Sequence, residues 1–360
     1  MSSKILVLPG DGIGVEVADQ TIRVIEKLNE QGLDANYEKD LVGGASYDVN
    51  GEPLTEAVLE KAKNSDAILL GAVRGSKCDN VERSKRPEAG LLGLRKELEL
   101  FANLRPALVF DALVDASTLK NDVVNNLDIM IVRELTGGVY FGQPRGIEDT
   151  SNGKKAIDTQ VYHDYEIDRI ARVAFDLASK RNNKVTSVEK ANVMETGVLW
   201  REVVKETHKD FSDITLENML ADNCAMQLVR NPKQFDVIVT DNLFGDLLSD
   251  CAAMLTGSLG MLPSASLGAE KNGKRYGLFE PVHGSAPDIA GQDKANPIAT
   301  ILSLSMMLKY NLNKPELSNK VENAVQQILS EGYRTGDIFT DENQTLVSCS
   351  KMGDLIIERI

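Results

Sequence analysis

The alternation of short apolar runs with amphipathic helical segments predicts an α/β fold. Buried strands are predicted where apolar residues run together and stop at glycine or a polar residue, as in residues 4–8 and 67–70. Helical segments follow or separate them at residues 14–29 and 54–64, which is a βαβ pattern. The dinucleotide fingerprint G-x-G-x-x-G is incomplete, because Val15 stands where its third glycine would be. We therefore predict an α/β fold that is not a Rossmann fold.

Size and composition narrow the class of protein. The 360 residues are 42% hydrophobic and 26% charged, which suits a globular protein of about two domains. The chain has no apolar run near the ~20 residues of a membrane span, and its N-terminus reads as a strand rather than a signal peptide. A net charge of −14 argues against a nucleic-acid-binding protein, because binding would need a basic surface. Four widely spaced cysteines predict free thiols in the cytoplasm.

The most informative stretch is residues 236–268. A buried strand is predicted at 237–239, and the helix after it carries Asp246 and Asp250 four positions apart on one face. Two like charges there cost the helix about 0.2–0.5 kcal/mol unless something neutralises them. Oxygen ligands suit Mg²⁺ or Mn²⁺. A solvated acidic face is the alternative; the position after a buried strand, where open α/β sheets bind ligands, favours the metal.

Three arginines stand near predicted element ends in this acidic chain. Arg95 lies on a helix predicted for residues 91–101, Arg105 follows it, and Arg133 follows a strand predicted at 129–132. Guanidinium groups bind carboxylates and phosphates bidentately, so together they predict an anion clamp. For each arginine alone, a surface ion pair is the ordinary alternative.

Lys190 and Asp222 are further candidates with ordinary alternatives. Lys190 follows a strand predicted at 184–189, where a lysine near carboxylates and a metal can act as a base. Alone it would be a surface lysine with a packed aliphatic stem. Asp222 opens a helix and equally fits an N-cap. The polar segment 143–157 predicts a hairpin or arm with its turn at Asn152 and Gly153.

A small-residue loop is the candidate nucleotide site. It consists of His283, Gly284, Ser285, Ala286, Pro287 and Asp288. A loop of this kind leading into a helix suits backbone contacts with phosphate and ribose. Asp288 would accept hydrogen bonds from ribose hydroxyls and repel a 2′-phosphate, so we expect NAD rather than NADP.

With these residues in place, the chain resembles the isocitrate/isopropylmalate dehydrogenase family of β-decarboxylating dehydrogenases. Residues 242–262, NLFGDLLSDCAAMLTGSLGML, are similar to the family signature from end to end, and the resemblance extends over essentially the whole chain. It implies an isopropylmalate dehydrogenase-like fold whose two domains share a central mixed sheet. Residues 1–101 with 256–360 would form the NAD-binding domain, and residues 102–255 an inserted domain. An arm at about residues 140–160 would help to form a homodimer.

The resemblance also implies roles for the acidic and catalytic residues. Asp246 and Asp250 match metal ligands of the family, completed by Asp222 from the neighbouring subunit. Tyr140 and Lys190 match its catalytic pair, and Lys190, assisted by Asp222, also reaches across the dimer interface. The active sites would therefore be shared between two subunits.

Further positions match the substrate and cofactor contacts of the family. Arg95, Arg105 and Arg133 match the arginines that hold the malate carboxylates. The loop at 283–288, with Asn296, matches the site of the NAD adenosine.

Three positions match those that separate the family's substrates, namely Glu88, Leu91 and Leu92. In the resemblance, leucine lines a pocket for a branched alkyl group and Glu88 lies near the nicotinamide. Burying a carboxylate against Leu91 without a partner would be costly. We therefore expect metal-dependent oxidative decarboxylation of 3-isopropylmalate by NAD⁺ to 4-methyl-2-oxopentanoate, a reaction of leucine biosynthesis.

Other functions remain open at this stage. Within the family, the substrate can be another 2-hydroxy diacid, such as homoisocitrate, tartrate or an alkylmalate. A Mg²⁺-dependent phosphotransferase could use the same aspartates and arginines, but the sequence contains no P-loop. A binding protein would leave the lysine and tyrosine unexplained. One departure from the family is Cys78, where an aromatic residue is usual, and this predicts a packing change at the rim of the site.

Overall fold

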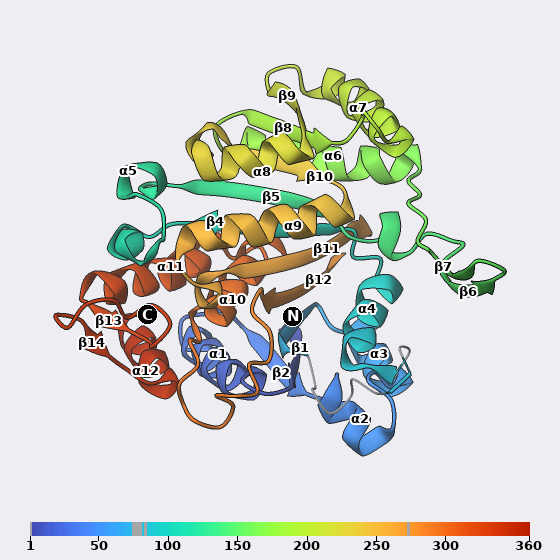
Figure 1. Cartoon of the computed structure of the whole chain (residues 1–360). Coiled ribbons are helices and arrows are strands. Elements are labelled where there is room, and N and C mark those ends of the chain that lie inside the picture. Colours follow the sequence, from blue (N-terminus) through green and yellow to red (C-terminus); the bar gives the residue numbers. More distant parts are fainter. Residues whose placement is uncertain (1, 74–80, 83–84, 272–273) are drawn as a thin grey trace. The chain divides into compact units, whose positions relative to one another are not determined.

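The computed structural model describes residues 2–73, 81–82, 85–271 and 274–360. The chain divides into two compact units (Figure 1). The first unit is formed by Met1–Leu100, Val109–Asn121 and Thr256–Ile360, and the second by Phe101–Leu108 and Asp122–Leu255. The segment Val109–Asn121 groups with the first unit, whereas the sequence analysis placed it in the inserted domain. Cys78 lies outside the described residues.

The first unit contains five strands of a mixed sheet in the order β2-β1-β3-β12-β11. They are β1 (Ser3–Gly10), β2 (Ala35–Lys39), β3 (Ala67–Ala72), β11 (Pro263–Lys271) and β12 (Lys274–Pro281). Neighbours are parallel except for the antiparallel pair β11–β12. This order differs from that of a Rossmann fold. The predicted α/β class with a large mixed sheet is confirmed.

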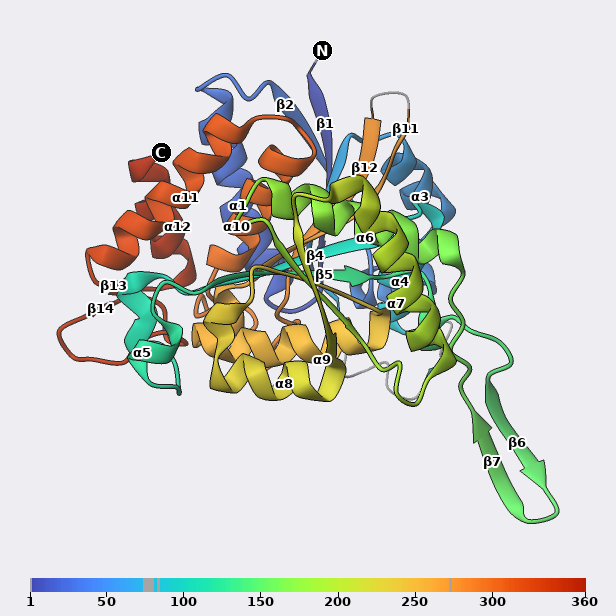
Figure 2. The same cartoon turned by 90° about the horizontal axis from the view of Figure 1, so that it is seen from above.

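Helices cover the strands of the first unit. They are α1 (Gly14–Asn29), α2 (Gly44–Asn50), α3 (Glu56–Lys63), α4 (Pro87–Glu97), α10 (Ile298–Tyr310), α11 (Pro315–Ser330) and α12 (Cys349–Arg359). Leu6, Leu8 and Leu70 share one apolar cluster with side chains of α3 and α4. Because side chains alternate between the faces of a strand, the opposite face is left for α1 and α10, which pack on these strands (Figure 2).

The described part of the second unit contains five strands of a mixed sheet, in the order β4-β5-β10-β8-β9. They are β4 (Ala102–Leu108), β5 (Asp128–Glu134), β8 (Lys184–Glu189), β9 (Thr215–Leu220) and β10 (Val237–Thr240). All neighbours are parallel except β4 and β5. Thr240 lies beside Arg133 and Val188, and Glu189 lies beside Leu220. The residues that follow these parallel strands therefore gather at one edge, where such sheets bind ligands.

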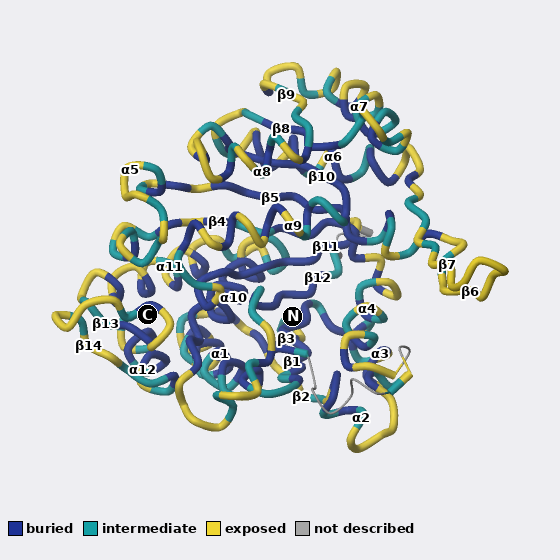
Figure 3. Tube along the Cα trace, viewed as in Figure 1, coloured by how far each residue is buried: buried dark blue, intermediate teal, exposed yellow. Residues whose placement is uncertain are grey.

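Two layers of helices cover the second sheet. They are α6 (Asp164–Ser179), α7 (Glu195–His208), α8 (Ala221–Arg230) and α9 (Asn242–Ala253), with a short α5 (Asn121–Val124). Figure 2 shows α6 and α7 on one face and α8 and α9 on the other. The central strands β5, β8 and β10 are largely buried, whereas the hairpin of β6 (Gly146–Thr150) and β7 (Gly153–Ile157) is exposed (Figure 3). The predicted hairpin is present, but its turn lies at residues 151–152 rather than at Asn152 and Gly153, because Gly153 already pairs with Thr150.

Some predicted boundaries are wrong. α4 begins at Pro87 rather than at residue 91, since proline is favoured at the first position of a helix. The loop at 283–288 does not lead directly into a helix, because turns continue until α10 begins at Ile298. Over the part of the chain that the structure describes, no helix has the length and apolar character needed to cross a membrane.

Candidate active site

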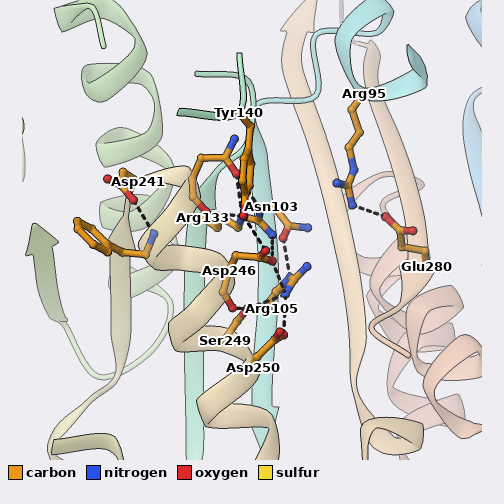
Figure 4. Close-up of polar contacts among 12 residues, drawn as sticks. Arg95, Asn103, Arg105, Arg133, Tyr140, Asp241, Asp246, Ser249, Asp250 and Glu280 are labelled. Carbon is orange, nitrogen blue, oxygen red and sulfur yellow. Dashed lines mark hydrogen bonds and ion pairs between the residues drawn. The ribbon is translucent and has the colours of Figure 1, made fainter. Parts of the chain in front are cut away.

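Arg133 and Asp246 form the centre of a polar cluster in the second unit (Figure 4). Arg133, near the end of β5, is buried, and its Nη1 lies 2.5 Å from Oδ1 of Asp246 on α9. Its Nε and Nη2 donate to Oδ1 of Asn242 over 3.1 and 2.8 Å, and Nε also lies 2.9 Å from the Asn242 carbonyl oxygen. The guanidinium group is thus oriented by its own subunit.

Tyr140 lies against this pair. Its hydroxyl donates to Oδ2 of Asp246 over 3.0 Å, and the Arg133 guanidinium lies 5.8 Å from its ring centre. Burial raises the pKa of the Tyr140 hydroxyl, and the negative charge of Asp246 raises it further. Tyr140 therefore carries its proton at neutral pH and can act as a proton donor.

Arg105, on β4, brings a second cation to α9. Its Nη1 donates to Oγ of Ser249 over 2.6 Å, and its Nε donates to Oδ1 of Asn103 over 2.9 Å. The same Nη1 lies 3.4 Å from Oδ1 of Asp250 and 3.6 Å from Oδ1 of Asp246. Arg105 and Arg133, which the sequence analysis predicted to clamp an anion, are brought together on one acidic helix face.

The carboxylates of Asp246 and Asp250 fit a hard divalent cation. Burial raises the pKa of Asp250; Arg105 lowers it, and the charge of Asp246 raises it further. A bound cation would relieve that repulsion, and the donors are oxygen atoms alone, as Mg²⁺ and Mn²⁺ prefer. Among the described residues, however, no three acidic, histidine or cysteine side chains gather closely enough to hold a metal. Asp222 is therefore not assembled with the α9 pair within one subunit.

Asp222 instead pairs with Lys190. The Lys190 Nζ lies 2.6 Å from Oδ1 of Asp222, and both side chains are accessible to solvent. The hydrogen bond from Lys190 lowers the pKa of Asp222. The N-cap interpretation of Asp222 is wrong, because α8 has Leu220 at its N-cap and Asp222 within its first turn. Its carboxylate is left for Lys190.

Buried groups next to Lys190 fix the position of its backbone. Glu189 accepts hydrogen bonds from the backbone of Ala191 and from Nε of Arg201, the latter over 2.9 Å. A Cβ on Gly197 would lie 2.8 Å from the carbonyl carbon of Lys190, so only glycine lets α7 approach this closely. The backbone at Lys190 is thus held by Glu189 and by the close approach of α7, while its amino group lies beside Asp222.

Arg95 is the third predicted anion ligand and lies in the first unit, on α4. Its Nη2 donates to Oε1 of Glu280 over 2.8 Å, and both side chains are largely buried (Figure 4). Its Nε is buried without a hydrogen-bond partner in the described part of the chain. A buried unpaired donor is costly, so this guanidinium fits an anionic ligand.

The predicted specificity positions occupy the same helix. Leu91 is partly buried and packs on the core cluster of the first unit, whereas Leu92 is 43% exposed and Glu88 is exposed. Of the two leucines, Leu92 is therefore the more accessible to a ligand, whereas Leu91 packs against the core.

The predicted nucleotide loop carries unsatisfied polar atoms. His283 Nδ1 lies 2.9 Å from the Gly284 carbonyl oxygen, and burial lowers the pKa of His283. Nε2 of His283 and Oγ of Ser285 are buried and have no hydrogen-bond partner among the described residues. The N–H of Ile13 donates to the Ser285 carbonyl over 2.8 Å, so the glycine loop after β1 packs on this loop. These orphan groups fit a polar ligand such as a dinucleotide.

The remaining predicted cofactor residues differ in access. Asp288, like Pro287, is exposed, whereas Ala286 is partly buried. Asn296 is buried, donates to Oδ2 of Asp337 over 3.0 Å and accepts from the N–H of Ile298 over 3.0 Å. Asp288 is thus available to a ribose, whereas the Asn296 side chain is occupied by its own unit.

Several polar residues of the cluster were missed by the sequence analysis. They are Asn103, Tyr162, Asn242 and Ser249. Two had a local signal: Asn103 shares a strand face with Arg105, and Ser249 lies three positions after Asp246 on α9. The only sequence signal for Asn242 was its position in the stretch that resembles the family signature. No local sequence feature predicted a role for Tyr162.

The fold and this cluster define a dehydrogenase of the isocitrate/isopropylmalate type. The model of the isocitrate/isopropylmalate dehydrogenase family matches residues 4–356, so the chain belongs to this family. The resemblance stated from the sequence is confirmed, and the chain is an oxidoreductase. Curated relatives include 3-isopropylmalate dehydrogenases of Rhodospirillum rubrum, 62% identical, and Pelagibacter ubique, 60% identical. Each alignment covers 99% of this chain, with 97% and 98% of the relative.

Solved structures agree with the fold. An isocitrate dehydrogenase from Methylococcus capsulatus matches with a TM-score of 0.86 at 34% identity, covering 99% of both chains. A β-decarboxylating dehydrogenase from Thermococcus kodakarensis, in its apo form, matches with a TM-score of 0.80 at 34% identity, covering 99% of this chain and 96% of that one.

Proposed function

We propose that this protein oxidises and decarboxylates (2R,3S)-3-isopropylmalate with NAD⁺, yielding 4-methyl-2-oxopentanoate and CO₂ in leucine biosynthesis. The observation that carries the proposal is the cluster of Arg105, Arg133, Tyr140 and Asp246, which combines carboxylate-binding cations with a proton donor. The curated relatives named for 3-isopropylmalate support this substrate. The exposed Leu92 supports a branched alkyl group rather than a further carboxylate.

Three arginines would hold the malate carboxylates. Arg133 and Arg105 are already oriented by Asn242, Ser249 and Asn103, so little ordering remains for binding. Arg95 adds the buried Nε donor that lacks a partner in the described chain. Bidentate contacts of this kind orient a planar carboxylate as well as bind it.

Asp246 and Asp250, with Asp222 of a second subunit, would hold Mg²⁺ or Mn²⁺. When bound, such an ion acts as a Lewis acid and lowers the pKa of an alcohol near it. Asp246 would have a second role, because it accepts a hydrogen bond from the Tyr140 hydroxyl and so positions Tyr140 beside the carboxylates.

Lys190 and Tyr140 would move the protons. Lys190, in its neutral form and assisted by Asp222, takes the proton of the substrate 2-hydroxyl while the hydride of the same carbon passes to NAD⁺. The resulting β-keto acid loses CO₂, and its bonding electrons pass to the neighbouring carbonyl. Tyr140 then gives its proton to the carbon that lost the carboxylate. The raised pKa of Tyr140 suits this late step, because the proton is retained until a strong base forms.

The loop at 283–288 would bind the adenosine part of NAD⁺, which accepts a hydride at its nicotinamide. His283 and Ser285 offer buried polar atoms without partners in the described chain, and Asp288 is exposed for the ribose hydroxyls. A carboxylate at Asp288 would repel a 2′-phosphate, which favours NAD over NADP.

We infer a homodimer with shared active sites. Met226 and Val229 on α8, with Leu247 and Met254 on and after α9, are each more than half exposed. Large exposed apolar side chains on two neighbouring helices support an interface at this surface. Asp222 and Asp246 lie on these same helices, so a second copy packed there would bring the Lys190–Asp222 pair to the metal-binding carboxylates. The exposed β6–β7 hairpin would add to the interface.

The reaction would take place in the cytoplasm. Cys224, Cys251 and Cys349 are free thiols, and Cys224 and Cys349 are buried. Reduced thiols are the state that this compartment maintains.

The test is NADH formation with 3-isopropylmalate, isocitrate, homoisocitrate and tartrate in parallel, with and without a chelator. We expect metal-dependent turnover on 3-isopropylmalate and little on the others. Comparable turnover on isocitrate would show that the leucines tolerate a carboxylate and would contradict the proposed substrate. No reduction of NAD⁺ with any diacid would contradict the proposed function altogether.

A further inference from the structure

A buried amide connects the two substrate-directed groups of the second unit. Asn242, the first residue of α9, accepts hydrogen bonds from Arg133 at its Oδ1, over 2.8 Å from Nη2 and 3.1 Å from Nε. Its Nδ2 donates to the carbonyl of Gly137 over 3.1 Å. Gly137 begins the turn that ends in η4 (Gly138–Tyr140). One side chain therefore contacts both Arg133 and the turn that carries Tyr140.

Tyr162 holds this amide in place. It is buried, and its hydroxyl accepts the backbone N–H of Asn242 over 2.9 Å. Its ring packs edge-on against Trp200, with ring centres 5.6 Å apart. A Cβ on Gly138, where φ is +76°, would lie 2.6 Å from the Tyr162 hydroxyl, and one on Gly137 would lie 2.8 Å from the ring. The turn rests directly on Tyr162.

Glu134 fixes the other end of the turn. Its carboxylate is fully buried and accepts the N–H groups of Thr136 and Gly137 over 3.1 and 2.8 Å. Arg169 Nη2 lies 3.3 Å from its Oε1 and 2.6 Å from Oγ1 of Thr136. The backbone before η4 is thus held by a carboxylate on one side and by Tyr162 and Asn242 on the other.

We propose that Asn242, held by Tyr162, is a positioning residue that sets Arg133 and Tyr140 together for the hydroxy-diacid substrate. The inference rests on the proposed function, in which Arg133 binds a carboxylate and Tyr140 returns a proton to carbon. An amide suits the task because it accepts from the guanidinium and donates to a carbonyl at once. A carboxylate could accept but not donate to Gly137.

The test uses Tyr162→Phe, which removes only the hydroxyl, and Asn242→Ala, which removes both side-chain contacts. We expect the KM for the diacid to rise at least about tenfold, because the loss of one buried hydrogen bond has this effect and each variant loses more than one. The ratio of CO₂ to NADH should fall, because a displaced Tyr140 lets the β-keto acid escape. The KM for NAD⁺ should not change. Tyr276→Phe, which loses a 3.2 Å hydrogen bond to the Lys63 carbonyl, is the matched control.

A purely structural role would give a different result. Variants that lose heat stability but keep the diacid KM and the CO₂ to NADH ratio within about twofold of the unmodified protein would overturn the inference. The assay uses whichever hydroxy diacid the unmodified protein oxidises fastest, so a different preferred substrate contradicts the proposed function alone. Calorimetric binding of malate reports the Arg133 part without turnover: unchanged affinity in both variants would also overturn the inference.

Discussion

Two cation–carboxylate pairs follow strands of the same sheet, yet they are built differently. Arg133 and Asp246 lie 2.5 Å apart with side chains 4% and 35% exposed, and Asn242 and Tyr140 hold them further. Lys190 and Asp222 lie 2.6 Å apart with side chains 23% and 62% exposed. The first pair is organised by its own subunit. The second lies at the surface, which is compatible with the proposed sharing of sites between subunits.

The difference in burial has an energetic consequence. An exposed ion pair contributes little to stability, so Lys190 and Asp222 can exchange each other for a ligand at little cost. The Arg133 cluster is already ordered and needs little reorganisation when charge develops beside it. One half of the proposed site is therefore preorganised, and the other half is adaptable.

Removing the base of the adaptable half should have the largest effect. Lys190→Met should lower the rate of hydride transfer by about a thousandfold or more, since a general base contributes up to four powers of ten. Single-turnover NADH formation measures this rate. Lys184→Met, at the first residue of the strand that precedes Lys190, loses a comparable 3.0 Å ion pair with Glu217 and should retain activity. Equal rates for Lys190→Met and the unmodified protein would exclude Lys190 as the base.

The proton donor of the preorganised half should affect a later step. Tyr140→Phe should lower steady-state turnover about a hundredfold, while the first hydride transfer persists and the β-keto acid accumulates. Tyr37→Phe is a matched control, because Tyr37 is also 37% exposed and donates to a carboxylate, that of Glu26, over 2.8 Å. Full CO₂ release by Tyr140→Phe would remove this tyrosine from the mechanism.

The unfolding free energy should depend on pH through Asp241, the buried N-cap of α9. Its carboxylate accepts from Phe244 N–H and from Gln160, and burial raises its pKa from 3.8 to about 6. A raised carboxyl pKa gives stability that is complete below about pH 4 and lost as pH rises through about 6. The unfolding free energy of Asp241→Asn, relative to that of the unmodified protein, should therefore rise by about 2–3 kcal/mol as the pH is raised from about 4 to about 7.

The control for this pH effect is an exposed aspartate. Asp176 pairs with Lys180 over 2.7 Å at the surface of α6, and Asp176→Asn should leave the pH dependence unchanged. Parallel unfolding curves for Asp241→Asn and the unmodified protein across this range would contradict the burial argument.

A single truncation within the preorganised half should have the smallest effect. Ser249→Ala removes the 2.6 Å acceptor of Arg105 but leaves the bond to Asn103. We expect the diacid KM to rise only about threefold to tenfold, with the maximal rate unchanged, as for one ordinary hydrogen bond, because Arg105 keeps its other partners. A loss of activity as large as that of Lys190→Met would mean that the remaining hydrogen bonds of Arg105 do not hold it in place.

Local periodicity revealed the parts of the site that depend on neighbours in sequence. The four-residue spacing of Asp246 and Asp250 placed both on one helix face, and α9 carries them so. The strand before Lys190 was likewise predicted at residues 184–189, and β8 has these bounds, although Val185 and Val188 are its only apolar residues.

Long-range polar pairs could not be predicted. Tyr162 and Asn242 are 80 positions apart, and Arg95 and Glu280 are 185 apart, so no local pattern connects them. The helix expected after Asp288 failed for another reason, because tertiary packing kept residues 289–297 in turns and bends until α10. Assignment of the site residues to two subunits came from the family resemblance and remains a prediction.

Subunit complementation tests the comparison most directly. Lys190→Met and Asp246→Asn, each inactive alone, are unfolded together and refolded as a mixture. If each site combines Asp246 of one subunit with Lys190 of the other, a mixed dimer has one intact site, and an equal mixture should regain about a quarter of full activity. A mixture that stays as inactive as its components would contradict a site shared between subunits.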